Sequence, residues 1–137
     1  MSGTMNLQDA LDILKRRYER EYCGFDNIYI DIKTEKCTGV SRDWGGFEDY
    51  YSYYAIYADI SFEKRIGTIT IKNQIRKTSE DLKDDLKEEL SELFKNEEYS
   101  VFSVYLPSFK DYTINYDREV EIFFEKKKEK SLSRKIN

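Results

Sequence analysis

The sequence predicts an α+β fold in which two amphipathic helices pack on one face of a mainly antiparallel sheet of about five strands, in the order α-β-β-β-α-β-β. Two segments place apolar residues at intervals of three and four, as one face of a helix requires. Other segments alternate apolar and polar residues, which is the period of a strand. The 137 residues, 39% of them apolar, are enough to form one hydrophobic core, and the chain is shorter than two domains usually require.

The first helix is predicted over residues 7–22. Asn6 is its expected N-cap, because a short polar side chain can accept a hydrogen bond from the first free amides. Gly24 is expected to end the helix, because glycine tolerates the left-handed conformation found there. The buried stripe consists of Leu7, Ala10, Leu11, Leu14 and Tyr18.

Three strands are predicted between the helices. Residues 27–33 alternate isoleucine with polar residues, and residues 53–62 form a longer alternating run that we expect at the centre of the sheet. A third strand is predicted over residues 66–72. Only the charged residues 63–65 separate the last two runs, so we expect an antiparallel hairpin with a short charged loop.

The second helix is predicted from Thr78 or Ser79 to about Asn96. Glu80 and Asp81 place negative charge in its first turn, where the free amides favour it. Its apolar stripe consists of Leu82, Leu86, Leu90, Leu93 and Phe94.

Two further strands are predicted after the second helix. The first covers residues 99–106 and ends before Pro107, the only proline, which cannot donate to a strand ladder. The second covers residues 112–125, again from alternation.

The two ends of the chain are expected to lie outside the core. Residues 1–4 precede a second methionine, Met5, and can be a cloning remnant, so the α+β domain is placed at residues 5–125. Residues 126–137 contain six Lys or Arg and one Glu, a net charge of +5, whereas residues 1–125 carry −9. Like-charge runs at termini are usually solvated, so we expect a basic, disordered tail.

Several classes of site lack their residues. The chain has no histidine, which removes the commonest general base and zinc ligand. The adjacent Gly45 and Gly46 are not followed by the lysine of a phosphate-binding loop. Cys23 and Cys37 have neither metal nor redox spacing and are expected to be reduced. The carboxylates Asp43, Glu48, Asp49 and Asp59 could converge at one end of the sheet, but they match no metal motif. We therefore expect no catalytic site, no metal and no cofactor.

One segment, residues 37–54, is unusually rich in aromatic residues for a connection between strands. We interpret it as a long surface loop that is presented to a partner, packed under the fold as a minor core, or used as a substrate lid. Tyrosine, tryptophan and arginine are enriched in recognition surfaces, because large rings give contact area at low entropic cost. The candidate partner-binding residues are Arg42, Asp43, Trp44, Phe47, Glu48, Asp49, Tyr50, Tyr51 and Tyr53.

These observations favour a non-enzymatic acidic binding protein that docks through the aromatic loop on a protein with a basic surface. A phage or mobile-element inhibitor of a host nucleic-acid-binding defence enzyme, or an immunity-type protein, belongs to this class. Without an apolar run of the roughly 18 residues that span a bilayer, and without a secretory pattern, we expect a cytoplasmic protein with no membrane partner. Nucleic acid is not expected as a partner, except through the basic tail.

Two alternatives stay open. The first is a small-ligand-binding domain, or an enzyme, that uses a sheet face lined by Tyr29, Tyr57, Tyr105 and Tyr116. The second is a homo-oligomeric structural protein that assembles through the same aromatic face.

Overall fold

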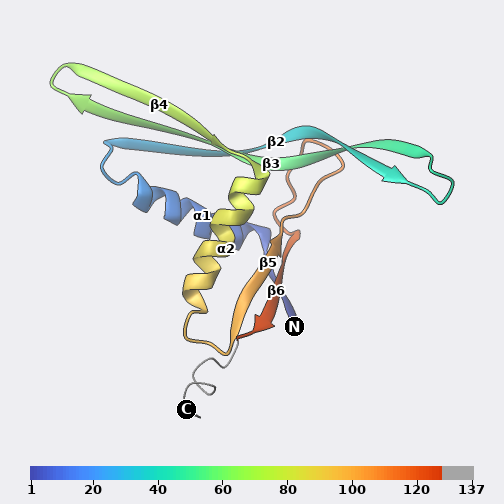
Figure 1. The fold of residues 1–137 in the computed structure, drawn as a ribbon. Helices are drawn as coiled ribbons and strands as arrows, with labels where there is room; N and C mark the ends of the chain where they lie inside the picture. Colours follow the sequence, from blue (N-terminus) through green and yellow to red (C-terminus); the bar gives the residue numbers. More distant parts are fainter. Residues whose placement is uncertain (128–137) are drawn as a thin grey trace, which may run out of the picture.

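The structure is a computed structural model, and it describes residues 1–127 (Figure 1). Eight elements follow one another: β1 (Ser2–Asn6), α1 (Leu7–Glu21), β2 (Asn27–Arg42), β3 (Glu48–Ile66), β4 (Ile69–Lys77), α2 (Ser79–Leu93), β5 (Tyr99–Tyr105) and β6 (Glu119–Lys126). Neither helix in this part of the chain is long and apolar enough to cross a membrane.

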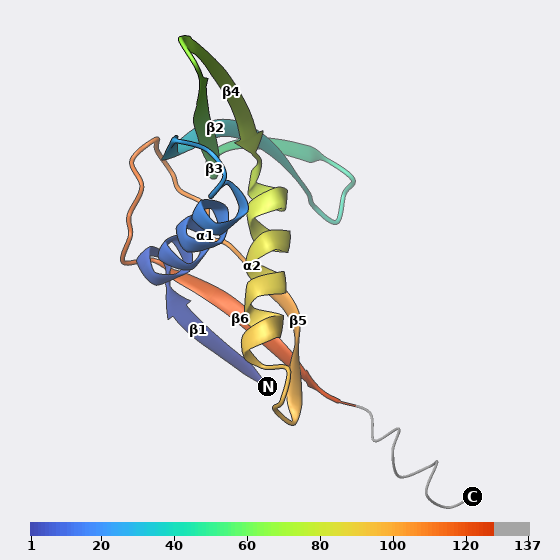
Figure 2. The same cartoon turned by 90° about the vertical axis from the view of Figure 1, so that its left-hand side faces the viewer.

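The strands form two antiparallel sheets of three strands each, in the orders β1-β6-β5 and β2-β3-β4. Both helices lie under the β2-β3-β4 sheet and against one face of the other sheet (Figures 1 and 2). One core connects the helices with both sheets. The α+β class is confirmed, whereas the single sheet of about five strands is wrong.

The first difference is at the amino terminus, where the expected element order lacked a strand. Residues 2–6 form β1 and pair with β6, with Met5 opposite Val120. Residues 1–4 therefore cannot be set aside from the fold. The sequence SGTMN has no apolar alternation, so its strand character comes from a partner more than a hundred residues away in the chain.

Helix α1 begins where predicted. The Asn6 side chain accepts a hydrogen bond of 2.8 Å from the Gln8 amide. The carbonyl oxygens of Arg118 and Tyr116 accept from the Leu7 and Gln8 amides, at 2.8 and 3.3 Å. The helix start is thus held by its own cap and by the segment that precedes β6.

A polar network joins α1 to α2. The buried Tyr18 hydroxyl donates a hydrogen bond of 2.7 Å to Asp85. Asp85 also lies 3.5 Å from the ammonium group of Lys77 and 3.6 Å from the guanidinium of Arg17. Burial, and then the hydrogen bond to Asp85, raises the pKa of Tyr18 well above the ordinary tyrosine value.

Helix α2 is held at both ends. Thr78 and Asp81 form a capping box, in which each side chain accepts a hydrogen bond from the other residue's amide. These hydrogen bonds to Thr78 lower the pKa of Asp81. At the other end the Lys127 ammonium donates to the carbonyl oxygens of Phe94 and Lys95, at 3.1 and 2.7 Å. Lys126 is the last residue of β6 and Lys127 holds the end of α2, so these first two residues of the expected basic tail belong to the fold, and residues 128–137 lie outside the described residues.

The strand predicted over residues 112–125 is wrong in its first half. Two Asx turns interrupt it, because Asp111 accepts from the Thr113 amide and Asn115 accepts from the Asp117 amide. Only residues 119–126 form β6. Residues 106–118 are instead a connection that touches β3 through a bridge between Phe109 and Tyr54.

The strands of the β2-β3-β4 sheet run well past the helices. β2 and β3 pair from Asn27–Glu63 to Arg42–Glu48, so the expected loop over residues 37–54 is wrong: it is the end of a long hairpin. The expected hairpin between β3 and β4 is confirmed as antiparallel, but residues 63–65 belong to β3. Its turn contains Gly67, which has a φ of 63°.

Candidate functional site

The candidate site is the free end of the β2–β3 hairpin, which we call the aromatic tip and define as residues 40–51. Trp44 is 107% exposed and Phe47 73%, and Tyr50, Tyr51 and Val40 are also exposed. The open question of exposure or self-packing is therefore answered in favour of exposure. Figure 1 shows the hairpin projecting to the right of the two helices.

The turn of the aromatic tip is held by Asp43. Its Oδ1 accepts hydrogen bonds from the amides of Gly45 and Phe47, both at 2.9 Å. The backbone closes the same turn, since the Asp43 amide donates to the Phe47 carbonyl at 3.1 Å. Gly46 has a φ of 80°, a conformation that glycine adopts without strain. The turn therefore presents Trp44 and Phe47 from a fixed backbone.

Behind the turn, the rings are supported across the hairpin. Gly39 is opposite Tyr51, and the Tyr51 ring covers Gly39 so closely that a β-carbon there would collide with it. The Tyr51 ring also lies 6.0 Å from that of Tyr53 on the same strand. Glycine at position 39 thus gives Tyr51 a surface on which to lie, as aromatic residues opposite strand glycines commonly do.

The aromatic tip is acidic. It contains Arg42 against Asp43, Glu48 and Asp49, a net charge of −2. Arg42 pairs with Glu48 at 2.8 Å, and Tyr50 donates to the same carboxylate at 3.0 Å. Asp49 makes no ion pair with any residue of the described chain. The surplus negative charge beside exposed rings suits a partner with basic groups around an apolar surface.

The structure brings the predicted site residues together at this tip, with one exception. Tyr53 lies farther down β3 and is half-buried. Sequence reasoning missed Val40, which is opposite Tyr50 and shares its face of the hairpin. Residues 34–42 combine β-branched and polar residues, a composition typical of a strand with both faces exposed to solvent. This composition could have indicated that the strand extends to Val40.

The four carboxylates considered for a metal do not converge. Asp59 is ten residues from Asp49 along an extended strand, a separation of about 33 Å at roughly 3.3 Å per residue. It is buried and lies 3.0 Å from Arg76 and 3.8 Å from Lys33. Within residues 1–127 no group of histidine, cysteine and carboxylate side chains is arranged to hold a metal ion.

The four tyrosines of the ligand-binding alternative do not surround one sheet face. Tyr29 and Tyr57 share the outer face of the β2-β3-β4 sheet, Tyr105 is on the other sheet, and Tyr116 is in the connection before β6. Tyr105 instead packs edge to face against Phe123, with ring centroids 5.4 Å apart.

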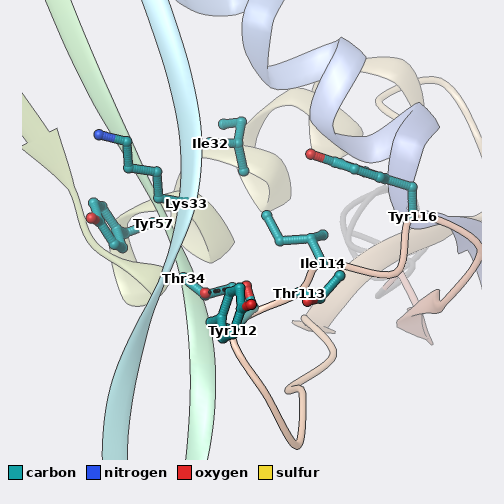
Figure 3. Close-up of a pocket in the computed structure, with 8 residues that line it drawn as sticks. All are labelled: Ile32, Lys33, Thr34, Tyr57, Tyr112, Thr113, Ile114 and Tyr116. Carbon is teal, nitrogen blue, oxygen red and sulfur yellow. Dashed lines mark hydrogen bonds between the residues drawn. The ribbon is translucent and has the colours of Figure 1, made fainter.

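An open pocket of about 500 Å³ lies beside the middle of β2. Lys33 and Tyr57 line one side, and Ile32, Ile114 and Tyr116 line the other (Figure 3). Because neighbouring strand residues point to opposite faces, the pocket wraps around the strand edge rather than enclosing a volume. Its polar groups do not converge on one point, which a small-ligand site requires.

Comparison with known proteins adds no relative, since no family model, no curated protein and no solved structure matches this chain.

Proposed function

We propose that the chain is a non-enzymatic binding protein that docks through the aromatic tip on a basic surface of a protein partner. The observation that supports this proposal is the exposure of Trp44 and Phe47 at the end of a fixed hairpin. Neither ring contributes to the core, so the stability of the fold does not explain why aromatic residues occupy these two positions. Exposed apolar clusters of this kind mark interaction sites more often than ordinary surface.

The geometry of the tip favours a high affinity for the partner although few residues make the contact. A backbone turn closed by Asp43 loses little conformational freedom on binding. Tryptophan at the centre of an interface is a frequent hot spot. The net charge of the tip would accelerate association with a basic surface, and salt would weaken that contribution. An inhibitor of a nucleic-acid-binding enzyme is one role that such a surface would serve.

The test is affinity capture by the tagged chain from a host lysate at low and moderate salt, with identification of retained proteins by mass spectrometry. A Trp44→Ala/Phe47→Ala variant should lose the partner, by at least about 30-fold in affinity if each ring is worth about 1–2 kcal/mol. Its melting temperature should equal that of the unmodified chain, because both side chains are exposed.

The matched control is Tyr112→Ala, which removes an exposed ring that lines the open pocket instead. It should retain the partner. Equal capture by the tip variant and the unmodified chain would contradict the proposal. A small molecule released on denaturation, and lost in Tyr112→Ala, would favour the ligand-binding alternative.

A further inference from the structure

A second apolar tip lies at the opposite end of β3, in the turn between β3 and β4. We call it the isoleucine tip and define it as residues 63–72. Ile66, Ile69 and Ile71 are 56%, 66% and 44% exposed. Ile66 is opposite Ile69, and Ile71 follows Ile69 by two residues, so the three share one face of the hairpin.

The isoleucine tip carries positive charge. It holds Lys64, Arg65 and Lys72 against Glu63, a net charge of +2, and Arg76 and Lys77 follow in β4, although the chain as a whole is acidic. Arg76 and Lys77 are neutralised by Asp59 and Asp85, at 3.0 and 3.5 Å, and both lie toward the helices.

The cations closest to the isoleucines remain available. Lys64 is opposite Ile71, on the isoleucine face, and Arg65 follows it. Neither forms an ion pair with another residue in the described chain. Lys72 lies 3.7 Å from Glu63, a long pair with an exposed lysine that contributes little. An apolar strip therefore ends this hairpin, and the unpaired cations Lys64 and Arg65 lie beside it on β3.

The two tips complement each other in both respects. The aromatic tip has exposed rings and a net charge of −2, whereas the isoleucine tip has exposed aliphatic side chains among unpaired cations. Contact between two isoleucine tips would bring Lys64 and Arg65 of both copies together. Contact between two aromatic tips would bring Asp49 and its neighbours together. Only unlike tips combine apolar burial with opposite charge.

We propose that the basic partner surface of the aromatic tip is the isoleucine tip of a second copy of this chain. This inference rests on the proposed function, for which it names the partner. β3 contributes to both tips, and the tips point in opposite directions from the body of the molecule (Figure 1). Each copy in such a contact still has one free aromatic tip or one free isoleucine tip. The association is head-to-tail, and it closes into a ring or extends as a chain.

The first measurement is the mass of the unmodified full chain by sedimentation velocity over a concentration series. The mass should rise with concentration and fall when salt is added, because opposite charges contribute to the contact. Trp44→Ala/Phe47→Ala and Ile66→Ser/Ile69→Ser should each remain monomeric. Lys64→Glu/Arg65→Glu is a second variant of the isoleucine tip that keeps its apolar residues, and it should also be monomeric.

The decisive measurement mixes two monomeric variants in equal amounts. Trp44→Ala/Phe47→Ala retains an intact isoleucine tip, and Ile66→Ser/Ile69→Ser retains an intact aromatic tip. The mixture should form a dimer of one copy of each, with twice the monomer mass, and nothing larger, because only one functional contact remains. Tyr112→Ala should associate like the unmodified chain.

The outcomes separate this inference from the proposed function. A chain that is monomeric at every concentration, but captures a basic protein through Trp44 and Phe47, overturns the second copy as partner and leaves the proposed function standing. Association that survives both tip variants overturns the inference, because another surface then carries it. Binding of the monomer to vesicles with anionic headgroups, or to duplex DNA, lost in Ile66→Ser/Ile69→Ser, assigns the isoleucine tip to that ligand and also overturns it.

Discussion

The hydrogen bond between Tyr18 and Asp85 gives the most quantitative prediction, because it is partly buried and joins the two helices. Tyr18→Phe removes the hydroxyl and keeps the ring. A hydrogen bond to a charged group contributes about 1.5–3 kcal/mol to stability. Asp85 retains Lys77 and Arg17 at 3.5 and 3.6 Å, so its carboxylate is not left without a partner. We therefore expect the lower end, a loss of about 1.5 kcal/mol in the free energy of unfolding.

Alkaline pH should change this difference. The pKa of Tyr18 is raised in the folded protein by burial and by Asp85, whereas an unfolded tyrosine ionises near pH 10. Its contribution to stability is complete below about pH 10 and falls above it by up to about 1.4 kcal/mol per pH unit, because only the unfolded state then loses the proton. The Tyr18→Phe variant lacks this loss, so the two stabilities should become equal near pH 11.

The assay is urea unfolding of both proteins at neutral pH and at several values between about pH 9 and 11, with an unchanged dependence on urea as the check for two-state behaviour. The same substitution at the exposed Tyr112 should leave the free energy of unfolding at neutral pH unaltered. Equal stability of Tyr18→Phe and the unmodified protein at neutral pH would contradict the stabilising role of this hydrogen bond. Stability curves that stay parallel through pH 11 would contradict the raised pKa of Tyr18.

Three further predictions concern the ends of α2 and the support of the aromatic tip. Thr78→Ala should cost about 1 kcal/mol by removing the hydroxyl that accepts from the Asp81 amide. Asp81 keeps the hydrogen bond from the amide of residue 78, the larger cause of its lowered pKa, so the loss of its contribution as pH falls below about 4 should largely persist in the variant, as urea unfolding can measure. Lys127→Met should lower stability by about 0.5–1 kcal/mol, since two carbonyl oxygens at the end of α2 lose their donor, and thermal unfolding at matched pH measures this. Gly39→Val should displace the Tyr51 ring and weaken partner binding, with a melting temperature close to that of the unmodified chain; an undiminished affinity would contradict the supporting role of Gly39.

The elements that could be predicted from the sequence are those that bury one face in the core. Both helices begin at their predicted caps, and residues 53–62 lie in the central strand. These predictions succeeded because the spacing of apolar residues reflects which residues face the core. The sequence of β1 shows no such apolar spacing, because its five residues obtain their structure from pairing with β6. Residues 112–118 misled for the opposite reason: their alternation is genuine, but two Asx turns use the backbone groups that a strand would pair.

The candidate site was identified by composition, but its form was not. Aromatic residues between two strands indicated recognition, and the same residues would have served as a minor core beneath a loop. Whether these residues are exposed or form a minor core depends on how far β2 and β3 extend beyond the helices. Sequence periodicity does not show how far a strand continues past the core. The isoleucine tip escaped notice for a related reason. Its alternating isoleucines resemble a half-buried strand, and only the structure shows that no helix covers them.

Because β3 forms part of both hairpins, a change in the length of either hairpin also determines which face its tip presents. It has 19 residues and enters both tips, with Ile56, Ala58 and Ile60 buried between them. Removing one residue between Tyr51 and Ile56 would turn the aromatic tip over relative to the core, and every ring would face the opposite side. Removing two, with two from β2, would shorten the hairpin by about 7 Å and keep each ring on its side. Reach can therefore be altered in steps of two residues per strand without changing which face is presented, so length and orientation are separable properties of this molecule.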